Sequence, residues 1–191
     1  DDRDPTQTFG PPDGLPGAVA QGTPLVVMVG RIEPWKGQDV FVEAVRQLPQ
    51  DLRDSAVFAL VGGGVDAKED YLAQVTQAAN AAGIVMLGTR SDVPDLLRAA
   101  DISVHASTSP DPFPGVVIES LLSGTATIAA RAGGAVEMID PGVSGFLTTP
   151  GDAAELCETL ATLLRAPESP RARFGAQARS RALSLVDAAT V

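Results

Sequence analysis

The chain has 191 residues, of which 45% are hydrophobic and 20% charged, and its net charge at pH 7 is −10. This length suits one domain, and the acidic charge argues against nucleic-acid binding, for which a basic surface is the usual footprint. The single cysteine, Cys157, excludes an internal disulfide framework and fits a reducing cytoplasm, and no apolar run reaches the roughly 18 residues of a membrane helix. We therefore expect a cytoplasmic protein without a signal peptide.

Residues 1–23 are rich in Asp, Pro and Gly with little periodicity, and we interpret them as a linker rather than a folded element. Residues 24–191 then form the domain. Residues 25–30 (LVVMVG) are a continuous apolar run that ends in glycine, which is typical of a strand buried on both faces of a parallel sheet. A loop follows at 30–37, and after it comes a helix whose apolar residues recur at helical spacing: Val40, Ala44, Val45 and Leu48.

Strands and helices alternate through the rest of the chain. The predicted strands are residues 57–61, 85–87, 102–105, 127–129 and 145–147. The predicted helices are residues 67–81, 93–99, 114–123 and 135–139, a helix that Asp152 opens, and a final one after Arg165. This alternation predicts an α/β fold with three layers, in which helices cover both faces of a doubly wound, Rossmann-like parallel sheet.

The final helix carries most of the basic residues near the carboxyl end. We interpret them as a solvated face rather than a contact surface; they are Arg165, Arg171, Arg173, Arg179 and Arg181.

Two weaker signals do not lead to a cofactor site. Gly62, Gly64 and Ala67 follow a strand at the spacing of a dinucleotide-binding turn, but the acidic residue expected about 20 residues later is missing, so we favour a plain tight turn. The lone His105 has no second histidine or cysteine at ligand spacing. We therefore predict no metal site and expect a structural role for His105.

Arg31 and Lys36 lie on one loop beyond a buried strand of an otherwise acidic protein. Arginine offers a planar fork of donors and lysine a compact charge, and together these suit a diphosphate. Simple solubility charges remain the alternative. We interpret Trp35, between them, as a lid or packing group.

The stretch at residues 111–134 organises the rest. A helix that starts at Pro114 leaves the amides of Gly115, Val116 and Val117 without intrahelical partners, and these suit a phosphate or carboxylate. Glu119 lies on this apolar helix, where its carboxylate should have a hydrogen-bonding partner. Asp111 precedes the helix; a ligand contact and a simple capping role are both open for it.

The motifs taken together resemble the carboxyl-terminal half of a retaining glycosyltransferase of the GT-B fold, family four. The matching segments are GRIEPWKG (30–37), VGGG (61–64), LGTRSDVPDLLRAADISVHAS (87–107), DPFPGVVIES (111–120) and SGTATIAARAGGAVEMI (123–139). They cover the chain from residue 24 in the family's order. The resemblance implies one half of a GT-B fold that binds a nucleotide sugar, linked to UDP or GDP, with no cofactor.

The resemblance also implies roles for individual residues. Arg31 and Lys36, beside Gly30, would bind the donor diphosphate, and Asp111 would contact the donor sugar; these three side chains are the implied catalytic residues. Glu119 would bind the ribose. The implied backbone contacts are Gly88, Thr89 and Arg90 for the nucleobase and Gly115, Val116 and Val117 for the phosphates.

The same resemblance implies that an amino-terminal, acceptor-binding domain is absent, so we expect this chain to be an excised domain or half of a longer protein, inactive alone. Peripheral membrane association of the full-length protein is left open. Two other functions remain: a nucleotide- or sugar-binding module without turnover, and a sugar-nucleotide epimerase of the same fold.

Overall fold

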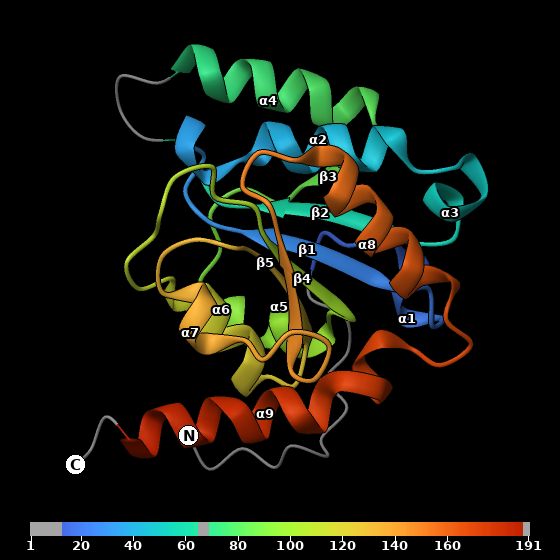
Figure 1. Ribbon diagram of the computed structural model, residues 1–191. Coiled ribbons are helices and arrows are strands. Elements are labelled where there is room, and N and C mark those ends of the chain that lie inside the picture. The colour runs from blue at the N-terminus through green and yellow to red at the C-terminus, as the bar shows by residue number, and fades with distance from the viewer. Residues whose placement is uncertain (1–12, 65–68, 189–191) are drawn as a thin grey trace.

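The computed structural model describes residues 13–64 and 69–188. Its centre is a sheet with the strand order β3-β2-β1-β4-β5-β6 (Figure 1), and every neighbouring pair is parallel. The strands are β1 (Leu25–Val29), β2 (Val57–Val61), β3 (Val85–Met86), β4 (Ile102–His105), β5 (Ala126–Ala130) and β6 (Gly145–Thr148). This order is that of a doubly wound sheet, so the predicted fold class is confirmed.

Helices connect the strands. They are α1 (Gly17–Ala20), the 3-10 turn η1 (Pro34–Lys36), α2 (Gln38–Gln47), α3 (Gln50–Asp54), α4 (Glu69–Ala81), α5 (Val93–Ala99), α6 (Gly115–Leu122), α7 (Ala135–Met138), α8 (Ala153–Arg165) and α9 (Pro170–Ala188). Among the described residues, no helix is long and apolar enough to span a bilayer.

Three short elements differ from the sequence prediction. Helix α1 lies within the stretch interpreted as a linker, and η1 and α3 were expected as loop. None of the three exceeds five residues, which is too short for a helical period to show in the sequence. Ala67, the last position of the glycine-rich turn, lies outside the described residues.

The sheet separates two layers of helices. In Figure 1, α2 and α4 lie above the sheet, and α5, α6 and α9 lie below it. Val26 and Met28 of β1 belong to the cluster that packs with α2, α4 and α8, whereas Leu25 and Val27 pack with α5 on the opposite side. Because successive strand residues point to opposite faces, a strand buried on both faces must be apolar throughout, as β1 is.

The strand order reverses between β1 and β4. Strands β1 and β4 are hydrogen-bonded neighbours, with Met28 opposite Val104. The chain leaves β1 toward α2 on one face and leaves β4 toward α6 on the other, so the two connections run to opposite faces of the sheet. Ligands of open α/β sheets bind at such a switch point.

The arginines of helix α9 do not form the solvated face that we predicted, because some of them bind other parts of the domain. Arg171 donates to the carbonyl oxygens of Ala100 and Ser123, at 3.1 and 2.6 Å. Arg181 likewise donates to the carbonyl of Met138. The last carbonyls of a helix have no intrahelical partner, and an arginine from a neighbouring helix can satisfy them. The basic residues of α9 therefore include two that fasten this helix to the domain.

Candidate functional site

The loop after β1 is held close to the loop after β4. Gly37 follows η1 with φ +76°, and a Cβ atom at this position would lie 2.0 Å from the carbonyl oxygen of Ala106. Only glycine fits both the left-handed backbone and this close approach. The backbone of Trp35 also accepts a hydrogen bond from the amide of Thr108, at 2.8 Å. The two loops that carry Lys36 and Asp111 are thus joined through their backbones.

Lys36 and Asp111 meet across this junction. The Lys36 ammonium lies 2.8 Å from Asp111 Oδ2, and only 17% and 11% of the two side chains are exposed. Burial works to raise the pKa of Asp111, but the hydrogen bond and the charge of Lys36 hold it below its ordinary value. Lys36 also lies over the Trp35 ring, 4.0 Å from its centroid. Trp35 therefore has a cation–π contact in addition to the packing role expected for it.

Asp111 does not cap the following helix. The N-cap residue of α6 is Pro114, and within the described residues no side chain caps the first turn. The backbone of Asp111 is held instead by the loop after β5, where the amide of Gly134 donates to its carbonyl at 2.9 Å. A Cβ atom on Gly133 would lie 2.1 Å from that carbonyl. The structure therefore rejects the capping alternative and fixes Asp111 from both sides.

Arg31 extends from the same loop into solvent. Its side chain is 66% exposed, and its guanidinium pairs with Glu33 at 2.9 Å. Glu33 is itself buried, and its other carboxylate oxygen accepts a hydrogen bond from Trp35 Nε1. Glu33 had no predicted role, although a carboxylate between two cations on one loop is a recognisable signal. It orients Arg31 and Trp35 together.

A small cavity of about 220 Å³ lies at the carboxyl ends of β1 and β2. Four of the residues predicted to bind the donor line this cavity: Gly30, Arg31, Thr89 and Arg90. Gly88 lies beside them, where its carbonyl accepts a hydrogen bond from the amide of Gly62. The structure thus brings together residues that are far apart in the sequence.

Asp92 holds the Arg90 side chain beside this cavity. Two guanidinium nitrogens donate to the two carboxylate oxygens, at 2.7 and 2.6 Å. This bidentate pair lowers the pKa of Asp92 below its ordinary value. Asp92 had no predicted role, since a pair two residues apart in a loop has no periodic signature. The Arg90 guanidinium is held in place by this pair and by a hydrogen bond to the Asp13 carbonyl.

The first turn of α6 offers fewer amides than predicted. The amide of Val117 donates to the carbonyl of Pro114 at 2.9 Å, so the expectation that it lacks an intrahelical partner is wrong. The helix begins with a tight turn, which satisfies one group that a regular first turn leaves unpaired. Among the described residues, no hydrogen bond is found for the amides of Gly115 and Val116. These two remain available to an anion.

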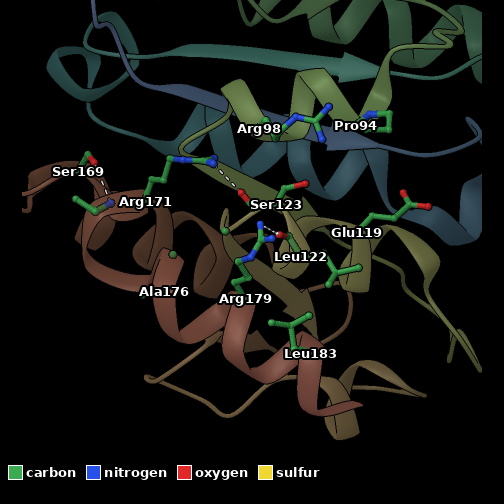
Figure 2. Close-up of a pocket in the computed structure, with 13 residues that line it drawn as sticks. Pro94, Arg98, Glu119, Leu122, Ser123, Ser169, Arg171, Ala176, Arg179 and Leu183 are labelled. Atoms are coloured by element: carbon green, nitrogen blue, oxygen red, sulfur yellow. Dashed lines mark hydrogen bonds between the residues drawn. The ribbon is translucent and has the colours of Figure 1, made fainter. Parts of the chain in front are cut away.

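Glu119 is exposed, and no hydrogen bond to its carboxylate is found in the described part of the chain. The expected partner is therefore missing, because the carboxylate lies on the outer side of the helix rather than in the core. Figure 2 shows Glu119 and Pro94 at one end of a groove of about 1000 Å³ and Ser169 and Arg171 at the other. Val93, the neighbour of Pro94, lines the 220 Å³ cavity. Glu119 thus lies on the far side of the first turn of α5 from that cavity.

His105 ends β4 and lies next to Asp111, 3.5 Å from its Oδ2 atom. Within residues 13–64 and 69–188, no group of three or more His, Cys, Asp or Glu side chains could hold a metal ion.

Comparisons with known proteins place this arrangement in a family. Residues 17–181 match the model of the family described as glycosyl transferases group 1. A D-inositol 3-phosphate glycosyltransferase of Catenulispora acidiphila is 34% identical over 81% of this chain and 37% of its own length. One of Thermobifida fusca is 33% identical over 85% of this chain and 38% of its own length. The chain spans less than two fifths of these relatives.

Solved structures agree. Anabaena HepE in complex with UDP and glucose is 34% identical, with a TM-score of 0.78 over 87% of this chain and 45% of that one. The C-terminal domain of the group 1 family protein LpcC of Francisella tularensis has a TM-score of 0.76 at 23% identity, which shows the fold, and this chain covers 94% of it. The predicted resemblance is confirmed: the chain belongs to the group 1 glycosyltransferases and forms the C-terminal domain of their GT-B fold.

Proposed function

We propose that this chain is the donor-binding half of a retaining glycosyltransferase whose donor is a nucleoside diphosphate sugar, linked to UDP or GDP. The observation that carries the proposal is the junction of Lys36 with Asp111 at the β1/β4 switch point, beside the free amides of α6. Structures similar to this chain are described as complexes with UDP and with UDP-glucose. A cation, amides and a carboxylate at one junction suit a diphosphate that bears a sugar.

The base would lie in the cavity, and the ribose would lie against the first turn of α5. We propose that the backbone of Gly88, Thr89 and Arg90 holds the base, since these residues surround or line the cavity of about 220 Å³. The exposed carboxylate of Glu119 would accept hydrogen bonds from the ribose hydroxyls. A carboxylate can accept from two hydroxyls at once, which suits a vicinal diol.

The diphosphate would lie between the loop after β1 and helix α6. Arg31 and Lys36 would supply positive charge, and Gly115 and Val116 amide donors; Val117 would contribute through its place in the same turn. These fixed groups stabilise the negative charge that develops on the leaving diphosphate as the sugar departs, which is their contribution to catalysis. We expect binding to need no divalent ion, because Arg31, Lys36 and the two amides would face the phosphates directly.

Asp111 would face the donor sugar and the reacting carbon. The acceptor would be bound by a further domain, since GT-B enzymes react in a cleft between two domains and this chain supplies one. We therefore expect the isolated chain to bind donor without transferring sugar. We place the whole enzyme in the cytoplasm, which suits a chain with one cysteine.

Calorimetric titration of this chain with UDP, GDP, ADP and their glucose conjugates tests the proposal. One nucleoside diphosphate should bind, with unchanged affinity in EDTA, and Lys36→Met should weaken it about ten- to a hundred-fold. Arg46→Met is the matched control, because Arg46 is an exposed cation that pairs with Glu43 on α2, away from the candidate site. Binding to none of the probes, or equal losses in both variants, would reject the proposal.

A further inference from the structure

The only histidine of the chain is buried against the candidate site. His105 is 5% exposed and lies on the α6 side of the sheet, as does Ser103 two residues earlier, which accepts a hydrogen bond from Ser120 of α6. Its Nε2 atom lies 3.0 Å from Ser107 Oγ and 3.5 Å from Asp111 Oδ2. Its Nδ1 atom is buried and has no hydrogen-bond partner in the described part of the chain.

This geometry places the proton of the ring. A neutral imidazole carries one N–H group, and a buried donor without an acceptor is costly. A proton on Nδ1 would have no acceptor, whereas a proton on Nε2 faces both Ser107 Oγ and Asp111 Oδ2. The Nε2–H tautomer is therefore favoured, with the Nδ1 lone pair buried and without a donor among the described residues.

We propose that His105 is a positioning residue for Asp111. Its Nε2–H group points to Asp111 Oδ2, the same carboxylate oxygen that Lys36 contacts. Oδ2 then receives both contacts, while no hydrogen bond from the described residues reaches Oδ1. The free oxygen is the one that can meet a ligand. The proposal rests on the proposed function only in taking that ligand to be the donor sugar.

Electrostatics support the neutral form of the ring. Burial in the first place, and the nearby charge of Lys36, lower the pKa of His105, while the carboxylate of Asp111 works to raise it. These are the two charged side chains that act on the ring, one from η1 and one from the loop after β4; Ser107, on the other contact, is uncharged. Each can be removed separately.

Nitrogen-15 NMR of this single histidine tests the contact without any ligand. At about pH 7.5, above the ordinary histidine pKa, the long-range spectrum should show the Nε2–H tautomer. Asp111→Asn should lower the pKa of the ring and Lys36→Met should raise it. A dominant Nδ1–H tautomer, or a ring pKa that Asp111→Asn leaves unchanged, would overturn the proposal. The measurement stands even if the chain binds no nucleotide.

Titration with UDP-glucose and UDP tests the consequence. His105→Phe should weaken UDP-glucose about ten-fold, as expected for a lost hydrogen bond to a charged group, and leave UDP within about two-fold. His105→Gln, which keeps an N–H donor, should restore part of the loss; it also serves if His105→Phe does not fold. Ser103→Ala is the control, because it removes a buried hydrogen bond from the same face of the same strand.

Two results would overturn the positioning role: equal weakening of both ligands by His105→Phe, or an equal loss of UDP-glucose in Ser103→Ala. If the wild type prefers GDP, the same comparison is made with GDP-glucose and GDP. Wild-type protein that binds no nucleoside diphosphate of either kind would instead count against the proposed function, and the NMR experiment would still decide the contact between His105 and Asp111.

Discussion

Lys36 Nζ lies 2.8 Å from Asp111 Oδ2, so a carboxylate already neutralises the ammonium that we assign to the donor diphosphate. A diphosphate that approaches Lys36 also approaches this carboxylate, and like charges repel. The two residues should therefore act in opposite directions on the affinity for a bare nucleoside diphosphate.

Asp111→Asn should tighten UDP binding by about two- to five-fold, because it removes a negative charge from beside the diphosphate. In a Lys36→Met background the same substitution should have a smaller effect, because the two residues are coupled. Calorimetry on the four members of this cycle measures the coupling. Glu43→Gln, in an exposed ion pair on α2, should leave UDP affinity unchanged. Additive effects of the two site variants would contradict the pairing.

Glu119 should be the ribose acceptor. Its carboxylate is exposed and without a partner in the described part of the chain, so it is free to accept from hydroxyls. Glu119→Gln should weaken UDP about ten-fold and remove the preference for UDP over 2′-deoxy-UDP. Glu158→Gln, an exposed carboxylate on α8, is the control. A preference for UDP that survives in Glu119→Gln would assign the ribose to another residue.

Gly37 should be irreplaceable for a steric reason as well as a conformational one. Gly37 and Gly142 have nearly the same φ, +76° and +77°, but a Cβ atom would meet the Ala106 carbonyl at 2.0 Å in the first and nothing within 4 Å in the second. Gly142→Ala should lower the free energy of unfolding by about 1–2 kcal/mol, the cost of a left-handed residue. Gly37→Ala should lower it by about 1–3 kcal/mol more. Equal urea midpoints for the two variants would show that the loops can separate without cost.

His105 should make stability depend on pH. Its pKa in the folded protein is lowered from the ordinary 6.5, so the unfolded chain takes up the proton first as the pH falls. The unfolded state then binds more protons, and the free energy of unfolding decreases below about pH 6.5. Urea midpoints at about pH 7.5 and 5.5, the range where histidine titrates, should differ in the wild type and converge in His105→Phe. A wild-type protein that gains stability over this fall in pH would exclude a lowered pKa.

Local pattern in the sequence determined the sheet and the loops that carry the site. The apolar run at β1 identifies a buried strand, and the regular alternation of strands and helices identifies β4, so Arg31, Lys36 and Asp111 could be assigned to loops at the carboxyl edge of a parallel sheet. The family motifs supplied the roles. These signals are local, since hydrophobic periodicity and turn residues act within a few positions.

The tertiary structure alone decided which side chains meet. Lys36 and Asp111 are 75 residues apart, and they pair because β1 and β4 become neighbours at the point where the strand order reverses. The same topology brings His105 under Asp111. The same packing places Arg171 next to the last carbonyls of helix α6, where it donates to Ser123. Charge patterning alone had predicted that Arg171 faces solvent. Contacts of this kind depend on strand order and on the faces that the helices cover, and no periodicity within one segment encodes them.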